Sequence, residues 1–183
     1  MTIGTLPEGR PWIVRPLRLL HSHQTVVISA GVTLLAKRDA FHSIKDCLLS
    51  GSGLTNVSII GEIGAGGAPA ATLRMRRADY SNATPGLNYT PGEWRHGIKL
   101  ENVSRVTLRG LRVTETGGDG LYLRGNSSNV LVEDCLFDHS FRQGLSIVSA
   151  VNFTARRCTF SDTGRGGYMR EDAGCGVDLE VCG

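Results

Sequence analysis

The chain has 183 residues, 24 of them glycine, with 6% aromatic residues and a formal net charge of +3. This length supports one hydrophobic core and is short for two domains, and so mild a charge does not indicate nucleic-acid binding, which needs a concentrated basic patch. No apolar run is long enough to span a membrane, and the N-terminal segment shows no signal-peptide pattern.

We expect residues 1–23 to form a strand and loop that lead into the main domain, because prolines alternate there with short apolar pieces. From residue 24 to residue 61, β-branched residues predict short strands with a bend at Gly31. The main domain is therefore predicted to comprise residues 24–183. Because a solenoid needs a cap at each end and this sequence stops just after a strand has begun, we expect it to be truncated at the C-terminus.

Two segments interrupt the regular pattern of the main domain, at residues 62–95 and 161–174. The first combines a glycine-rich piece, an arginine-rich piece and a piece rich in Pro, Asn and Thr. Long unrepetitive insertions in a regular array are usually functional or disordered. Met75, Tyr80 and Trp94 have the character of packing anchors, so we expect the first insertion to be ordered.

From residue 96 onward the sequence repeats itself about every two dozen residues. A glycine followed by apolar, any and apolar residues occurs four times, and a second phrase recurs between these copies. The glycine phrases begin at Gly97, Gly120, Gly144 and Gly176. Such a period predicts a solenoid in which one coil of chain stacks on the next.

The strand period of two sorts these residues into an interior and an exterior set. The apolar positions of each phrase should face inward and the residues between them outward. Stacked coils would then pair through parallel hydrogen bonds. The prediction is an all-β protein, a right-handed parallel β-helix with coils of about 23–24 residues; the hand follows from the rule for parallel crossovers and from the coil length.

The five cysteines show no close pair of the kind that binds a metal. Cys135 and Cys158 hold equivalent positions in successive repeats, so they should stack on adjacent coils. We interpret them as part of a ladder of small buried side chains, with a disulfide or a metal site as the alternatives.

The phrases G-L-Y-L, N-V-L-V-E-D-C-L-F, R-Q-G-L-S-I-V-S-A-V-N-F-T-A-R-R-C-T-F and G-V-D-L-E resemble the repeats of right-handed parallel β-helix proteins of the pectate lyase-like superfamily. The resemblance covers residues 24–61 and 96–180. It implies the fold, a polysaccharide ligand and a secreted or cell-surface location. The Asn-Thr-Asp, Asp-Asp, Gly-His-Gly and Arg-Ile-Lys signatures of polygalacturonase-type hydrolases do not occur, nor does the Asp-Pro-His-Glu run of alginate epimerases, so no catalytic residue is transferred by motif.

Both insertions enter the coil just before its glycine strand, so they should emerge along one edge of one sheet and wall a groove there. A groove along stacked coils suits an extended polymer, because its subsites repeat as the coils do. The catalytic candidates on this face are His96, Asp119, Arg142, Asp178 and Glu180. The substrate-binding candidates are Trp94, Arg95, Lys99, Tyr122 and Ser146.

Two reactions are open for such a face. Elimination from a uronic-acid polymer needs cations at the C5 carboxylate and a base, which Arg95, Lys99 and Arg142 and then His96, Tyr122 or an arginine could supply. Hydrolysis needs two carboxylates flanking the bond, with Asp119, Asp178 and Glu180 as candidates. The sequence therefore predicts a polysaccharide lyase or a glycoside hydrolase.

A non-catalytic carbohydrate-binding or adhesive module, such as a phage tail or surface protein uses, is the alternative. For either function we expect a polysaccharide partner, no nucleic acid and no membrane. The sequence indicates no cofactor and no metal ligand set, although calcium stays open. It does not define the oligomeric state.

Overall fold

The computed structural model describes residues 1–81, 86–164 and 175–179. In this part the chain winds through three parallel sheets of six strands, which we number sheet 1, sheet 2 and sheet 3. Sheet 1 contains β1 (Thr2–Ile3), β4 (Gln24–Ile28), β7 (Thr55–Gly61), β10 (Ser104–Arg109), β13 (Ser127–Glu133) and β16 (Ala150–Arg156). Sheet 2 contains β2 (Trp12–Val14), β5 (Thr33–Ala36), β8 (Ala71–Arg74), β11 (Leu111–Thr114), β14 (Leu136–Asp138) and β17 (Thr159–Ser161). Sheet 3 contains β3 (Leu17–Arg18), β6 (Leu49–Ser52), β9 (Ile98–Glu101), β12 (Leu121–Arg124), β15 (Leu145–Ile147) and β18 (Val177–Leu179).

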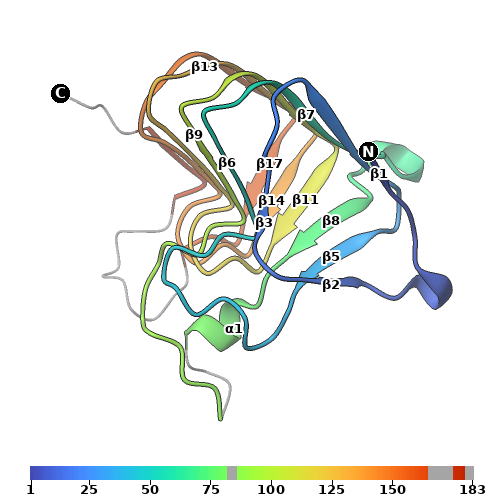
Figure 1. The fold of residues 1–183 in the computed structure, drawn as a ribbon, viewed down its shortest axis with the longest axis vertical. Helices are drawn as coiled ribbons and strands as arrows, with labels where there is room; N and C mark the ends of the chain where they lie inside the picture. Colours follow the sequence, from blue (N-terminus) through green and yellow to red (C-terminus); the bar gives the residue numbers. More distant parts are fainter. Residues whose placement is uncertain (82–85, 165–174, 180–183) are drawn as a thin grey trace.

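Each coil gives one strand to each sheet, and each strand pairs with the strand three elements later in the chain. Figure 1 shows this for sheet 2, whose strands from β2 to β17 lie as successive arrows running the same way. The predicted all-β solenoid is confirmed. The helical elements of the described residues are short: the 3₁₀ turns η1 (Pro7–Gly9) and η2 (Ala65–Gly67) and the helix α1 (Arg77–Tyr80).

In-register columns of apolar side chains fill the space between the sheets. Val113 pairs with Phe137, and Phe137 with Phe160, on three successive coils of sheet 2. The two phenylalanine rings stack with their centroids 5.4 Å apart. Leu121 and Leu145 continue a second column in sheet 3. These columns are those that the alternation of the repeat predicts, and parallel pairing keeps like residues in contact from coil to coil.

The second repeat phrase marks a backbone feature of sheet 1. Asn56, Asn129 and Asn152 share one position of the coil and have φ values of 55°, 52° and 57°. Asparagine tolerates this left-handed conformation better than most residues. Arg105 holds the same position with φ 53°. The register skips this position, since Ser104 and Val106 pair across it, so the recurring asparagine has a structural reason.

Two regions differ from the sequence prediction. The expected lead-in of residues 1–23 is itself a coil, because β1, β2 and β3 pair with β4, β5 and β6. The segment 62–95 contains β8, which pairs with β5 and β11, so the stretches that leave the coil flank this strand. Connections of different length separate these strands, so the sequence period is lost although the register is kept. The insertion at 161–174 lies largely outside the described residues.

Replacing Phe137 tests the stacked core. Its side chain is fully buried, so Phe137→Ala should lower the free energy of unfolding by about 3–5 kcal/mol through lost transfer energy and a residual cavity. The matched control is Val151→Ala on β16, where 72% of the residue is exposed and the change should stay within about 0.5 kcal/mol. Urea unfolding followed by circular dichroism measures both, and similar losses in the two variants would contradict a core organised by this column.

Candidate functional site

The outward face of sheet 3 carries a row of polar side chains in register across all six of its described strands. Pairing places each member opposite the next, one coil further along. The row consists of Arg18, Ser50, Lys99, Tyr122, Ser146 and Asp178. At a strand spacing of about 4.8 Å, its five intervals extend over roughly 24 Å. The alternation that sends leucines inward therefore lines up one polar residue per coil on the outside.

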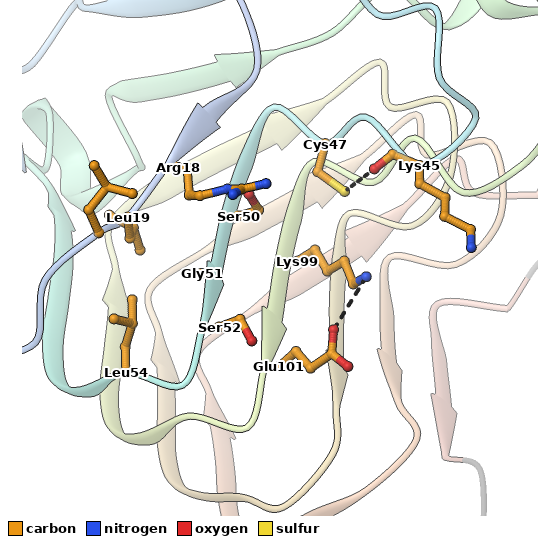
Figure 2. Close-up of a pocket in the computed structure, with 11 residues that line it drawn as sticks. Arg18, Leu19, Lys45, Cys47, Ser50, Gly51, Ser52, Leu54, Lys99 and Glu101 are labelled. Atoms are coloured by element: carbon orange, nitrogen blue, oxygen red, sulfur yellow. Dashed lines mark hydrogen bonds and ion pairs between the residues drawn. The ribbon is translucent and has the colours of Figure 1, made fainter.

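Two adjoining pockets lie over this row. The first, of about 430 Å³, covers β3, β6 and β9 and is lined by Arg18, Ser50 and Glu101 among others. Figure 2 shows Lys99 and Lys45 at one side of it, with Lys99 directed toward Glu101. The second, of about 460 Å³, is lined by Lys45, Trp94, His96, Lys99, Tyr122 and Arg124. Because Lys45 and Lys99 line both pockets, the two form one groove along the stacked coils, which we call the sheet 3 groove.

Positive charge prevails in the sheet 3 groove. Four cationic side chains line it, and Glu101 is the carboxylate that lines it among the described residues. Glu101 lies 3.5 Å from the Lys99 ammonium and 3.2 Å from Arg124 Nε. The remaining cations are Arg18 and Lys45. One carboxylate cannot neutralise four cations, so the groove can attract an anionic ligand.

Aromatic surface lies next to these cations. Trp94 is 43% exposed at the second pocket, although its residue type suggested a buried anchor. Tyr122 stacks on the His96 imidazole with ring centroids 4.5 Å apart and planes 4° from parallel. Exposed aromatic faces beside polar groups suit ligands that have both apolar and polar surfaces. Sugar rings are such ligands.

His96 and Asp119 form a buried pair at the edge of the groove, with exposures of 3% and 0%. The backbone N–H of Asp119 donates to His96 Nδ1 at 3.0 Å, which assigns the imidazole proton to Nε2. The Asp119 Oδ2 atom lies 3.3 Å from the same nitrogen. A protonated Asp119 carboxyl could donate a hydrogen bond to Nδ1, whereas an ionised carboxylate would be repelled by the Nδ1 lone pair.

Burial shifts both groups toward their uncharged forms. It lowers the pKa of His96 to about 3, with further lowering by the positive charges of Arg142 and Lys99. Burial raises the pKa of Asp119 to about 6, against the opposing effects of Arg142, the Gln143 backbone N–H and the Ser146 hydroxyl. At neutral pH the imidazole is therefore uncharged and Asp119 is ionised, and Asp119 takes up a proton in mildly acidic solution.

Arg142 joins this pair to the end of the first insertion. Its Nε lies 3.7 Å from Asp119 Oδ1 and 4.0 Å from Glu93 Oε2. The Gln143 backbone N–H donates to Asp119 Oδ1 at 3.2 Å. Gly118 allows the close approach, since a Cβ there would lie 2.6 Å from the Glu93 carbonyl oxygen. Three separate segments thus meet at one carboxylate, and Arg142 serves it as a counter-ion.

Arg95 differs from its predicted place on the outward face. It is completely buried, and its guanidinium donates to the carbonyl oxygens of Phe41, His42 and Thr90 at 2.8–3.0 Å. Its guanidinium also lies 5.4 Å from the ring centroids of both Tyr80 and Tyr89, which contact each other edge to face. Arg95 therefore fastens the first insertion to the coils and is not available to a ligand in this structure.

The other candidates take different places in the structure. Lys99, Tyr122 and Trp94 line the groove. Ser146 belongs to the outward row but is fully buried beside Asp119. Asp178 is half-buried on β18, opposite Ser146. Glu180 lies outside the described residues.

Four charged residues of the groove were not among the sequence candidates: Arg18, Lys45, Glu101 and Arg124. The outward parity of Glu101 and Arg124 was visible in the repeat, whereas Arg18 falls in the region expected to be a lead-in. Within the described residues, no three His, Cys, Asp or Glu side chains come together as a metal ion would require. None of the helices described there is long and apolar enough to cross a membrane.

Comparisons with known proteins agree with this architecture. A family model described as "Right handed beta helix region" matches residues 25–180. The "Uncharacterized protein YclG" of Bacillus subtilis (strain 168) is 26% identical over 117 aligned residues, which cover 58% of this chain and 20% of that protein. The chain thus spans about one fifth of that curated relative.

A solved structure extends the comparison in three dimensions. It is the crystal structure of a protein from Parabacteroides merdae ATCC 43184 named "putative glycosyl hydrolase". The TM-score is 0.60 at 14% sequence identity, covering 98% of this chain and 74% of that one. At this identity the likeness concerns the fold.

Asp119→Asn tests the buried pair. Because folding raises the pKa of Asp119, the folded protein binds its proton more tightly than the unfolded chain does. The stability that this group contributes is complete below about pH 4 and lost as the pH rises through about 6. The asparagine variant should therefore be more stable than the wild type at pH 8, by about 3 kcal/mol at about 1.4 kcal/mol per pKa unit, and lose this advantage near pH 4.

Urea unfolding at pH 4, 6 and 8 measures the difference. Asp39→Asn, at a side chain that is 70% exposed, controls for the loss of a carboxylate at the surface. A constant difference between Asp119→Asn and the wild type across this range would show that Asp119 does not change protonation there.

Proposed function

We propose that this chain, which belongs to the right-handed β-helix family, binds an extended acidic polysaccharide in the sheet 3 groove and cleaves it by elimination. The observation that carries the proposal is the in-register polar row with two adjoining pockets that share Lys45 and Lys99. A ligand that repeats along its length matches a surface that repeats coil by coil. The name of the structural neighbour supports a carbohydrate role on a similar scaffold.

Charge favours an acidic polymer over a neutral one. Lys99 and Arg124 line the same pocket as Trp94 and Tyr122, so a uronate carboxylate could meet the cations while its ring covers an aromatic face. Arg18 and Lys45 extend this pattern along the groove. An extracellular or cell-surface location, which we also propose, would bring the groove to such polymers.

Elimination needs a cationic environment for the C5 carboxylate, a base for the C5 proton and a donor for the leaving oxygen. In the second pocket Lys99 and Arg124 suit the first task. We assign the base to Tyr122, which as a phenolate takes the C5 proton and then gives it to the leaving oxygen. The Nε2–H of His96 donates a hydrogen bond to that oxygen, because Nδ1 already accepts from the Asp119 backbone. Asp119 positions the imidazole. Arg142 acts through Asp119 and so is a positioning residue.

A non-catalytic binding module is the second candidate function. The observation in its favour is the burial of His96 and Asp119, which limits their contact with a ligand. A binding module would use the same groove and the same cations as the enzyme, and the two functions differ only in whether product forms.

A depolymerisation screen separates these functions. The chain is incubated with polygalacturonate, alginate, glucuronan and neutral glucans, with added calcium and with a chelator, since we propose calcium-independent action. Unsaturated products absorbing in the ultraviolet are expected from the acidic polymers. Saturated reducing ends would mean hydrolysis instead, and retention on an acidic polymer without product would leave the binding module. The absence of both product and retention, on every acidic polymer tested, would refute the proposed function.

Lys99→Ala tests the binding surface itself. Lys99 lines both pockets, so its loss should weaken retention on the acidic polymer about tenfold at low salt, equivalent to about 1.4 kcal/mol. Arg10→Ala removes one positive charge just after η1, in the connection between sheets 1 and 2, and should leave retention unchanged. Affinity electrophoresis in gels containing the polymer, at two salt concentrations, measures both variants. Equal losses would point to net charge and not to the groove.

A further inference from the structure

Cys135 and Cys158 hold equivalent positions at the corner between sheet 1 and sheet 2 on adjacent coils. The next residues, Leu136 and Thr159, are paired in the parallel ladder of β14 and β17. Backbone hydrogen bonds lie on both sides of the cysteines, from the Asp134 N–H to the Arg156 carbonyl at 3.2 Å and from the Thr159 N–H to the Cys135 carbonyl at 2.9 Å. The Cα atoms are therefore about one strand spacing apart, about 4.8 Å, which lies within the range of about 4.4–6.8 Å found in disulfides.

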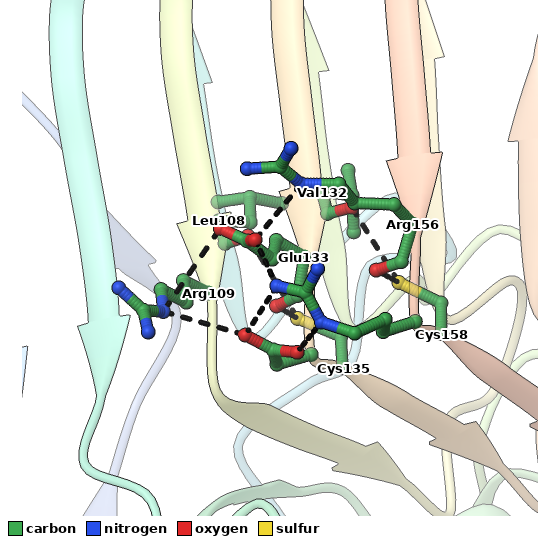
Figure 3. Close-up of polar contacts among 9 residues, drawn as sticks. Leu108, Arg109, Val132, Glu133, Cys135, Arg156 and Cys158 are labelled. Atoms are coloured by element: carbon green, nitrogen blue, oxygen red, sulfur yellow. Dashed lines mark hydrogen bonds and ion pairs between the residues drawn. The ribbon is translucent and has the colours of Figure 1, made fainter.

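The two side chains also point the same way. Cys135 Sγ lies 3.2 Å from the Glu133 carbonyl oxygen, and Cys158 Sγ lies 3.4 Å from the Arg156 carbonyl oxygen. Each sulfur also faces a carbonyl of the preceding coil, that of Leu108 for Cys135 and that of Val132 for Cys158. Figure 3 shows these repeated contacts on neighbouring strands. The thiols are thus stacked copies of one position.

An ion-pair network holds the two corners together. Glu133 bonds both Arg156, at 2.8 Å, and Arg157. Asp134 lies 2.6 Å from Arg157 Nε and 3.4 Å from Arg109 Nε. Figure 3 shows Arg109, Glu133 and Arg156 grouped beside the two cysteines. Because ion pairs join the residues preceding each cysteine across the coils, the backbone at the two cysteines loses little conformational freedom when the sulfurs form a bond.

The pair is asymmetric in the way a reactive dithiol requires. Cys135 is buried and Cys158 is half-buried. The neighbouring Cys135 thiol lowers the pKa of Cys158 to about 7, while the Cys158 thiol and burial raise the pKa of Cys135. A thiolate is the attacking form of cysteine, so Cys158 is the more reactive of the two near neutral pH.

We propose that Cys135 and Cys158 form a reversible disulfide that joins two successive coils, with a small-molecule disulfide such as oxidised glutathione as the oxidant. The Cys158 thiolate attacks one sulfur of glutathione disulfide, forms a mixed disulfide and releases one glutathione thiolate. Cys135 then loses its proton and attacks the Cys158 sulfur, and the second glutathione leaves as a thiolate. The chain loses two electrons and two protons, and one glutathione disulfide becomes two glutathione thiols.

Peptide mapping of the wild-type chain tests the proposal directly. The reduced protein is equilibrated with glutathione disulfide under native conditions, alkylated and digested with trypsin without reduction. Arg142 and Arg157 lie between the two cysteines, so trypsin places them in separate peptides. A linked pair containing Cys135 and Cys158 is expected as the main oxidised product, and reductant should abolish it.

Variants define the order of the steps. Cys135→Ser should trap glutathione on Cys158, and Cys158→Ser should leave Cys135 reduced in the folded protein. Cys47→Ser is the matched control, since Cys47 is a buried thiol elsewhere whose pKa burial raises to about 11, and it should keep the Cys135–Cys158 link. Wild-type protein that ends with both cysteines unlinked, or that links them only in urea, would overturn the proposal; neither result depends on the folding of a variant.

Discussion

The register of the parallel ladder is the constraint on which the rest of this structure depends. Each coil satisfies its backbone N–H and C=O groups by bonding to the coils on either side, so every strand is fixed to the strand three elements away. A slip of one residue would turn the whole apolar set outward. Fixed register therefore produces the phenylalanine column of sheet 2, the polar row of sheet 3 and the stacked cysteines by the same mechanism.

The buried pair of His96 and Asp119 departs from this regular pattern, because two titratable side chains lie where the repeat places apolar ones or turns. Burial disfavours the charged form of both groups. At neutral pH His96 is uncharged and Asp119 carries one negative charge, and Arg142 Nε lies 3.7 Å from Asp119 Oδ1. Perturbed pKa values of this kind cluster at functional sites, although structural ion pairs also produce them. Here the pair adjoins a groove through the stacked rings of His96 and Tyr122, which links it to a place where a ligand can bind.

Residues that obey the repeat could be predicted from the sequence, and residues fixed by contacts outside the repeat could not. The phase of the glycine phrases predicts Lys99 and Tyr122 on the outer face and Leu121 in the core. Arg95 has the same parity as Arg142, yet it is buried, because carbonyl groups of Phe41 and Thr90 close around its guanidinium. The contacts with Phe41 and His42 join segments more than 50 residues apart, and no periodicity encodes them. Arg18 could not be predicted because its coil lacks the repeated sequence phrases, although its strand pairs in register with the next coil.

The spacing of the coils also bears on which reaction the groove could carry. Hydrolysis needs carboxyl groups about 5–5.5 Å apart for retention or about 6.5–9.5 Å apart for inversion. Among the described residues of the outer face, Glu101 on β9 and Asp178 on β18 stand three strand spacings apart across the sheet and two residues apart along it, roughly 16 Å, and Glu101 is held by Lys99 and Arg124. Asp119 is closer but sealed beneath the surface. Cations, by contrast, come from adjacent strands and from Lys45 at the same point. This arrangement stabilises the extra negative charge that develops on a uronate carboxylate when the C5 proton leaves, and the cleavage of a neutral glycosidic bond does not require it.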